Sequence, residues 1–215
     1  MNSQQASEHV CNWFAKVPFL DLHLLNVEND GITPVVGTGA KKRLLCSEAL
    51  VKKTRQLGKQ IMDDWQGDRR LQGISYLIYR RGVSRELLPL YVGIARSSKK
   101  DGTNYSCLWK TRGSRFCDSY KSNGHVDCLS RSLFEGTKGY THWAFELFCK
   151  TDDTSGLLVP MLQSPVYVHI DLWDSNAYRI LPTIPDAPLY VEEKVRLWIL
   201  KVAGYGPQVL NREGN

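Results

Sequence analysis

The sequence predicts an α+β fold in which a small, mostly antiparallel sheet is flanked by helices. Two dense apolar and aromatic runs, 74–79 and 88–94, lie close enough in the chain to form a hairpin of two strands. Two longer segments, 47–65 and 189–202, carry apolar residues at helical spacing. Adjacent strands with helices before and after them are typical of this class.

Length and composition restrict the class of protein. The 215 residues suit one domain with additions, and 42% hydrophobic and 23% charged residues are ordinary for a globular chain. These values exclude a disordered chain, a collagen-like chain and a coiled coil. The sequence lacks a run of about 18 apolar residues and begins with a polar stretch rather than a secretory signal. We therefore expect a cytoplasmic protein that does not contact a membrane.

The first part of the chain is expected to be a helical extension, residues 1–70, packed on a core at 71–215. Residues 7–17 suit a short amphipathic helix that stops before a proline. The helix at 47–65 has a suitable N-cap in Ser47. Its apolar residues recur at helical spacing and its other face is basic. The apolar set is Leu50, Leu57, Ile61 and Trp65.

The core is expected to continue after the hairpin with a long irregular insertion. Residues 96–125 lack clean periodicity, and a short helix is expected at 126–134. Further strands are expected at 142–149 and 165–172. The last helix should bury one apolar face and end at a glycine. The residues of that face are Val191, Val195, Trp198 and Val202.

Positive charge is concentrated in the middle of the chain. The net charge of +6 includes +4 within residues 96–137 alone, where 8 basic residues stand against 4 acidic ones. Aromatic side chains lie among the cations, and this combination favours nucleic acid, because cations neutralise phosphates and rings stack on bases. A solvated basic loop is the alternative. The candidate nucleic-acid contacts are Lys99, Lys100, Lys110, Arg112, Arg115 and Lys121.

Three segments in order carry a family resemblance. One strand begins Gly73-Ile74, a second contains Tyr91-Val92-Gly93, and a late helix with Glu192 is followed by Asn211. This set resembles the GIY-YIG nuclease family over roughly residues 72–211, with long insertions. The resemblance implies a tyrosine that activates water, an arginine that clamps the phosphate, and one glutamate that holds a single Mg²⁺ or Mn²⁺. The implied catalytic residues are Tyr76, Tyr91, Arg131, Glu192 and Asn211.

The chain departs from the family pattern at Ser75, where the family has tyrosine. Tyr76 would face the other side of a regular strand, so either a bulge lets Tyr76 act, or Tyr79 acts from the face of Ser75, or activity is impaired. Arg131 is preferred as the clamp because it precedes an expected strand. Arg112 and Arg115 stay open as alternatives.

Helix geometry selects the metal ligand between two neighbouring glutamates. On a helical wheel Glu192 lies about 80° from the centre of the expected apolar face, and Glu193 lies about 180° away. A half-buried position at the edge suits a metal carboxylate, so we expect Glu192 to hold the cation. Glu193 is then a solvated charge near the helix N-terminus.

The resemblance implies divalent-metal-dependent hydrolysis of double-stranded DNA. A chain without a further appended domain is similar to a type II restriction endonuclease, which would act as a homodimer or a higher even oligomer beside a cognate DNA methyltransferase. The basic insertion at 96–125 would read the bases. A repair or mobile-element nuclease is one alternative. A non-catalytic nucleic-acid-binding protein on a decayed nuclease core is another, because of Ser75, and the sequence does not separate DNA from RNA.

Overall fold

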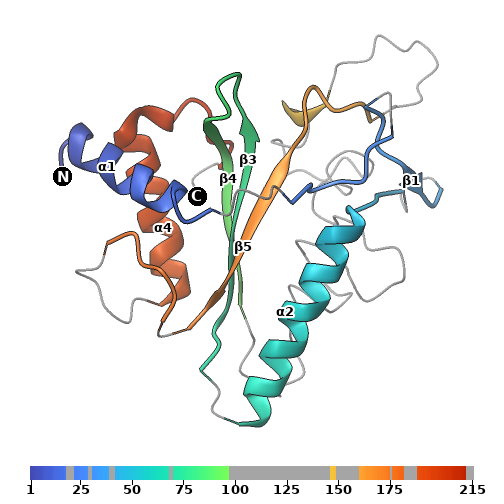
Figure 1. Cartoon of the computed structure of the whole chain (residues 1–215), viewed down its shortest axis with the longest axis horizontal. Coiled ribbons are helices and arrows are strands. Elements are labelled where there is room, and N and C mark those ends of the chain that lie inside the picture. The colour runs from blue at the N-terminus through green and yellow to red at the C-terminus, as the bar shows by residue number, and fades with distance from the viewer. Residues whose placement is uncertain are drawn as a thin grey trace.

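A computed structural model describes nine segments of the chain. They are residues 1–17, 22–28, 31–38, 42–67, 70–96, 146–148, 160–174, 176–181 and 188–211. At the centre lies a three-stranded antiparallel sheet of order β4-β3-β5, with helices on both sides (Figure 1). Its strands are β3 (Gly73–Arg81), β4 (Leu87–Arg96) and β5 (Tyr167–Trp173). The predicted α+β class is confirmed.

The helices begin where local sequence favours them. In α1 (Ser3–Phe14) the side chain of Asn2 accepts from the Gln5 amide at 2.9 Å, and Gln5 returns a hydrogen bond to the Asn2 amide at 3.0 Å. This capping box starts the helix four residues earlier than the predicted range. In α2 (Glu48–Gln66) Ser47 is the N-cap, as predicted, and its hydroxyl accepts from the Leu50 amide at 3.1 Å.

The remaining elements lie at the periphery and at the C-terminal end. A two-stranded antiparallel sheet joins β1 (Val35–Val36) to β2 (Arg43–Leu44). The late helix α4 (Leu189–Leu200) continues into a π-helical turn, η3 (Lys201–Tyr205), in which Gly204 has a positive φ of 93°. No helix among the described segments is long and apolar enough to cross a membrane.

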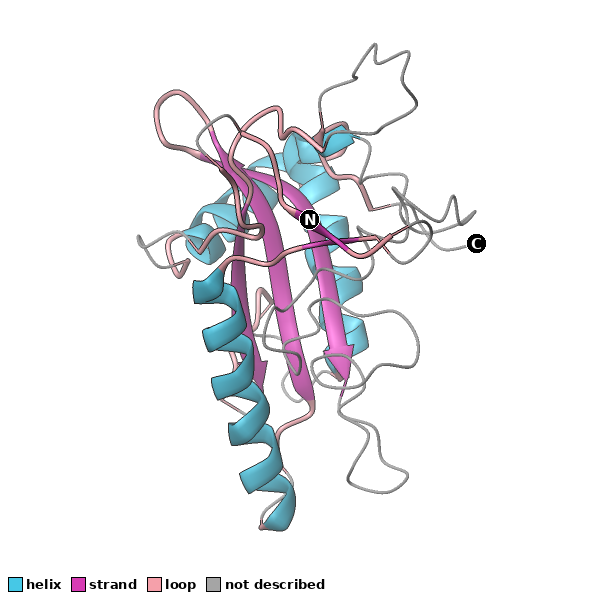
Figure 2. Cartoon of the chain, turned by 90° about the vertical axis from the view of Figure 1, so that its right-hand side faces the viewer, coloured by secondary structure: helices cyan, strands magenta, loops and turns pink. Residues whose placement is uncertain are grey.

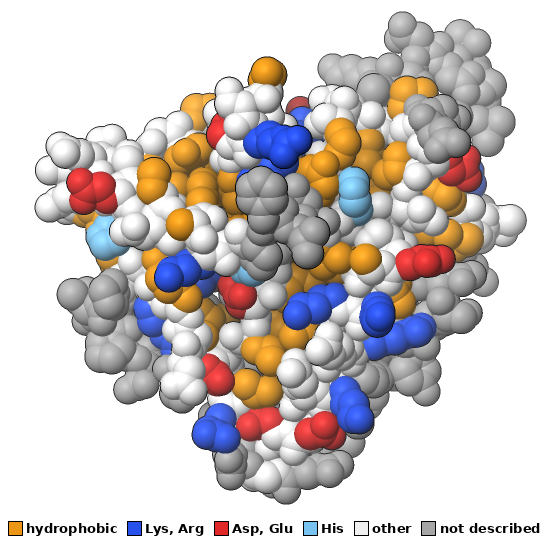
Figure 3. All heavy atoms as spheres, in the orientation of Figure 1, with side chains coloured by type: hydrophobic (Ala, Val, Ile, Leu, Met, Phe, Trp, Pro, Cys, Tyr) orange, Lys and Arg blue, Asp and Glu red, His pale blue; other side chains and the backbone are white. Residues whose placement is uncertain are grey.

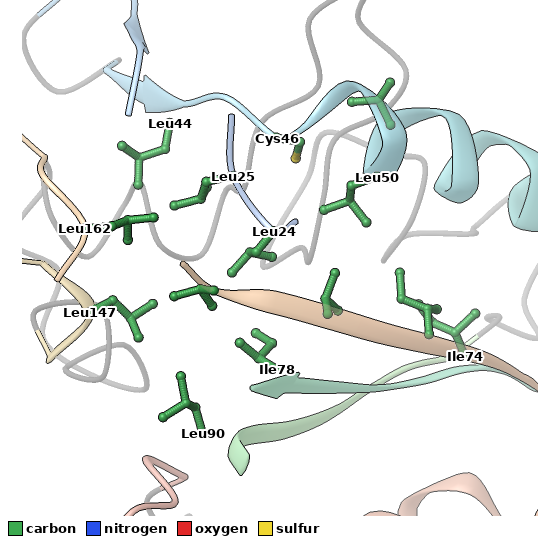
Figure 4. Close-up of a cluster of buried hydrophobic side chains, with 14 of the residues drawn as sticks. Leu24, Leu25, Leu44, Cys46, Leu50, Ile74, Ile78, Leu90, Leu147 and Leu162 are labelled. Atoms are coloured by element: carbon green, nitrogen blue, oxygen red, sulfur yellow. The ribbon is translucent and has the colours of Figure 1, made fainter. Parts of the chain in front are cut away.

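Two hydrophobic clusters lie on opposite faces of the central sheet, because successive side chains of β3 alternate between them. The α2 face carries Ile74, Tyr76 and Ile78, which pack with α2 and with residues 22–28. Figure 4 shows part of this cluster, where Leu50 of α2 lies above the strand that carries Ile74 and Ile78. The α4 face carries the other β3 residues, packed against α1 and α4. These residues are Ser75, Leu77 and Tyr79.

The side view separates the two layers. In Figure 2 the strands stand between α2 in front and the other helices behind. Leu50, Leu57 and Ile61 of α2 belong to the cluster on the α2 face. Residues 1–70 thus contribute to both clusters, since α1 packs on α4 and η3.

The predicted buried face of the last helix is wrong. Trp198, which was expected at its centre, is 46% exposed, and Val191 and Val195 are half-buried. Two charged residues, Glu192 and Arg196, occupy the core side instead. The buried residues of α4 are Leu189, Glu192, Arg196, Ile199 and Leu200. The apolar wheel failed because it counts charged residues as solvated, whereas these two are paired one turn apart.

Candidate functional site

A buried ion pair lies within the late helix, between two residues one turn apart. The Arg196 Nε–H donates to Glu192 Oε1 at 3.0 Å, and each side chain is only 2% exposed. The amide of Ile180 donates to the same oxygen at 2.9 Å. The second oxygen, Oε2, accepts no hydrogen bond within the described segments. Glu192 is therefore held firmly by one oxygen, at the centre of the buried face rather than at its edge as predicted.

The guanidinium of Arg196 donates hydrogen bonds to neighbours from three parts of the chain. Its Nη1 donates to the Ser75 hydroxyl at 3.3 Å and its Nη2 to the carbonyl of Tyr178 at 3.2 Å. The arginine thus fixes Ser75 and Glu192 relative to each other. Burial raises the pKa of the Tyr178 phenol, the charge of Arg196 lowers it and that of Glu192 raises it, so the phenol lies within electrostatic reach of the pair.

Aromatic rings enclose this ion pair. The guanidinium carbon of Arg196 lies 4.7 Å from the centre of the Trp13 ring and 5.6 Å from that of Trp173. A second guanidinium, that of Arg179, lies 3.7 Å from the Trp173 ring. Alternating rings and cations desolvate Arg196 while the ring faces partly replace its lost water. The arrangement connects α1, β5 and α4.

The two tyrosines predicted to be catalytic lie on the other side of the sheet. Tyr76 and Tyr91 are on the α2 face, and their rings stack with centres 6.1 Å apart and planes at 15°. Gly93 is paired with Tyr76 across the hairpin, and a methyl group there would overlap the tyrosine ring. The structure thus brings Tyr76 and Tyr91 together but separates both from Glu192.

Neither route proposed for replacing the missing tyrosine is found. The irregularity in the hairpin lies between Ile78 and Tyr79, with the extra residue Leu90 on β4, so Tyr76 keeps its place on the face opposite Ser75. Tyr79 is on the face of Ser75, but it is only 1% exposed, within the core. Neither side chain can meet substrate beside Ser75 in this arrangement.

Asn211 is hydrogen-bonded to β4, the strand that carries Tyr91-Val92-Gly93. Its side-chain oxygen accepts from the Val92 amide at 2.9 Å, and its amide nitrogen donates to the Val92 carbonyl at 2.7 Å. The two residues are 119 positions apart. Asn211 therefore extends the hydrogen bonding of the Tyr91-Val92-Gly93 strand in the way a further strand would.

Several predicted site residues lie outside the described segments. These are Arg131, the alternatives Arg112 and Arg115, and the other candidate nucleic-acid contacts, Lys99, Lys100, Lys110 and Lys121. On the face seen in Figure 3, basic and acidic side chains of the described residues are interspersed. The described surface in that view therefore has no single basic patch that could take the place of the expected basic insertion.

Sequence reasoning missed several residues of the α4 face. Arg196 was not considered, although its position four residues after Glu192 is the spacing of a helical ion pair. The sequence motifs also do not include His169, whose Nε2 lies 2.9 Å from Asp171 Oδ2 on β5. No local pattern pointed to Tyr178. Its proximity to Arg196 depends on how the segment after β5 folds back.

The donor chemistry suits one weakly held divalent cation. Glu192 Oε2 is a hard oxygen ligand without a hydrogen bond in the described segments, and Mg²⁺ retains most of its waters when it binds few protein groups. Within those segments, no cluster of three or more His, Cys, Asp or Glu side chains could form a complete protein cage. The positive charge of Arg196 beside the carboxylate also reduces affinity for a cation.

Comparisons with protein-family models, with curated proteins and with solved structures find no match to this chain. The geometry of the site and the resemblance of the sequence motifs are therefore the basis of a functional proposal.

Proposed function

We propose that the protein is a divalent-metal-dependent endonuclease that hydrolyses phosphodiester bonds of double-stranded DNA. The observation that carries this proposal is the convergence of the motif positions in space. Ser75, where the family resemblance implies tyrosine, is joined through Arg196 to Glu192, although Ser75 and Arg196 are 121 residues apart. Asn211 is bonded to the Tyr91-Val92-Gly93 strand. Ordinary packing of unrelated segments does not require these particular positions to meet.

The residues of the α4 face have distinct roles in the proposed reaction. Glu192 would hold the cation through Oε2, while Arg196 and the Ile180 amide keep the carboxylate in one orientation. A bound Mg²⁺ or Mn²⁺ would neutralise phosphate charge and acidify a bound water. Arg196 positions Glu192 rather than clamping a phosphate, because its guanidinium is buried and each of its three nitrogens donates to a protein oxygen.

The finer proposal is a sequence-specific type II restriction enzyme. One such site cuts one strand, so cleavage of a palindromic duplex requires two sites related by a two-fold axis, in a homodimer or a higher even oligomer. A cognate DNA methyltransferase would protect the host sequence. Discrete fragments from plasmid DNA support this proposal, whereas a smear or random nicks support a less specific repair or mobile-element nuclease.

A second candidate is a nucleic-acid-binding protein that does not cleave. It is favoured by the burial of Glu192 against Arg196, because a neutralised, enclosed carboxylate is a poor cation ligand. The Ser75 hydroxyl oxygen also accepts a hydrogen bond from Arg196 and is directed toward this buried pair. In this case the family core would be retained as a scaffold for binding.

Cleavage by Glu192→Gln tests the proposal, with Glu193→Gln as the adjacent control. Glutamine keeps an oxygen for Arg196 and Ile180 but removes the charge that holds the cation. We expect Glu192→Gln to lose plasmid cleavage at every Mg²⁺ concentration and to bind DNA in gel shifts, while Glu193→Gln cuts normally. Glu192→Asp retains the charge and should cut weakly, which separates loss of the metal from loss of folding.

Each of the remaining outcomes decides between the candidates. Wild-type protein that binds DNA with and without Mg²⁺ or Mn²⁺ and never cuts it supports the second candidate. A Glu192→Gln protein that cuts at the wild-type rate contradicts the assignment of the metal to this helix.

A further inference from the structure

We propose that His169 is the general base of the reaction and that Asp171 positions it. This inference rests on the proposed nuclease function. The family resemblance implies a tyrosine at position 75 that activates water. Because this chain has Ser75 there, the role of accepting the proton is open, and we assign it to His169. The residues that carry it are on the edge strand β5 and were not part of the sequence motifs.

The register of the sheet places this pair on the α4 face. Asp171 is directly opposite Ser75, and His169 is directly opposite Leu77. Residues opposite each other in an antiparallel pair share a face, with Cβ atoms about 5 Å apart. The Cα of His169 lies about 7 Å along β5 from that of Asp171, and the imidazole reaches back toward the position opposite Ser75 to meet the carboxylate.

The hydrogen bond between the two side chains sets the tautomer. His169 Nε2 lies 2.9 Å from Asp171 Oδ2, so a neutral imidazole donates Nε2–H to the carboxylate and keeps its lone pair on Nδ1. Within the described segments Nδ1 has no hydrogen bond. The His169 side chain is 13% exposed and that of Asp171 39% exposed, so water reaches the pair. A carboxylate that orients an imidazole and stabilises its protonated form is the arrangement of a general base.

The tyrosines described above are less suitable for this role. Tyr76 is on the opposite face, and Tyr79 is enclosed in the core. Burial raises the pKa of Tyr178, so its phenol keeps its proton at neutral pH. Among the described residues of the α4 face, the His169 imidazole has a ring nitrogen, Nδ1, whose lone pair can accept a proton.

The hydrolysis requires no reactant other than water and DNA. Nδ1 of His169 accepts a proton from water as the water oxygen forms its bond to phosphorus. The phosphorus–O3′ bond breaks with its electron pair on the leaving oxygen, which takes a proton from solvent. The products are a 3′-hydroxyl and a 5′-phosphate, and the imidazolium returns its proton to bulk water.

Other charged and titratable groups share this face with His169. Asp171 is its hydrogen-bond partner, whereas Glu192 and Arg196 are paired with each other. These groups are Asp171 and Tyr167 on β5, Tyr79 on β3, Glu192 and Arg196 on α4, and Tyr178 and Arg179 after β5.

The test is the pH profile of single-turnover plasmid cleavage with saturating Mg²⁺. We expect His169→Gln to lower the rate by about 10²–10⁴-fold and to flatten the rise in rate with pH on the acid side. Asp171→Asn should have a smaller effect, because it changes only the orientation and stabilisation of the imidazole. His23→Gln is the matched control, since His23 lies beside the same edge strand and pairs with no carboxylate in the described segments, so it should leave both rate and profile unchanged.

Chemical rescue separates chemistry from folding. His169→Gly should regain rate when free imidazole is added, and both His169 variants should bind DNA as tightly as wild type in gel shifts. A His169→Gln protein that cuts within about threefold of wild type, with the same acid-side profile, overturns this inference and leaves the nuclease function standing. Wild-type protein that does not cut at all overturns both.

Discussion

The two faces of the central sheet use the same strands for different purposes. On the α2 face, β3 contributes Ile74 and Ile78 to a cluster of apolar side chains (Figure 4), and the ring of Tyr76 packs against it. On the α4 face, the intervening positions include Ser75, which bonds to a fully buried charged pair. One layer is held by apolar packing, whereas the other combines apolar packing with directional bonds that require specific partners.

This difference indicates where function is concentrated. Apolar packing tolerates exchange among residues of similar volume, whereas a buried ion pair needs both partners and their hydrogen bonds. A buried pair can often be replaced by apolar residues without loss of stability, so its presence is not explained by stability alone. The α4 face therefore holds the stronger candidate for a site, and three predictions test the contrast between the faces.

The largest effect is expected when Arg196 is removed. Arg196→Ala leaves the carboxylate of Glu192 buried without its cation, and we expect the free energy of unfolding to fall by about 3–5 kcal/mol. It also opens the space between the Trp13 and Trp173 rings. Urea unfolding followed by tryptophan fluorescence measures this loss. Lys194→Ala, an exposed change on the same helix, should alter stability by less than about 0.5 kcal/mol.

A double variant identifies the source of that loss. Glu192→Leu combined with Arg196→Met replaces both charges with apolar groups, and it should recover most of the stability lost in Arg196→Ala. If the double variant is no more stable than Arg196→Ala, the loss arises from packing of the arginine stem rather than from the stranded carboxylate.

A smaller effect is expected on the α2 face at Gly93. Gly93→Ala places a methyl group against the Tyr76 ring, which must leave its stack on Tyr91, and we expect a cost of about 1–3 kcal/mol. Thermal unfolding measures it. Tyr76→Leu in the Gly93→Ala background should reduce the cost, because the shorter side chain makes room. An equal cost in both backgrounds would locate the strain in the strand itself.

Features set by interactions between residues close in the sequence were predicted, and features that depend on residues far apart were not. The helix at 48–66 was predicted because its N-cap and apolar stripe are local, and the strands of the hairpin were predicted because they are adjacent in the chain. The α4 face was not, because its bonds join residues far apart. Ser75 and Arg196 are separated by 121 positions, and no spacing rule relates them.

The candidate site was predicted in part for the same reason. The motif positions Ser75, Glu192 and Asn211 were identified from their order, and the structure connects each of them to the core. The partner that fixes Glu192 and the histidine on the third strand were missed, since a charged residue on a helix is ordinarily assigned to solvent. A helical pair such as Glu192 and Arg196 can be either exposed or buried, and only tertiary packing decides which.

The smallest effect separates the faces by their response to alkaline pH. Burial raises the pKa of Tyr178 above its ordinary value of 10.0, and burial also raises that of Tyr205, which contacts α1. A raised pKa in the folded state means that the unfolded chain loses its protons first. This contribution to stability is complete below about pH 10 and is lost as pH rises through the folded pKa.

Tyr178→Phe cannot ionise, so its free energy of unfolding should fall less steeply than that of wild type between about pH 9 and 11. Urea unfolding at several pH values measures the two slopes. Identical slopes would mean that the Tyr178 phenol is as well solvated in the folded protein as in the unfolded chain, and that the polar network of the α4 face ends at Arg196.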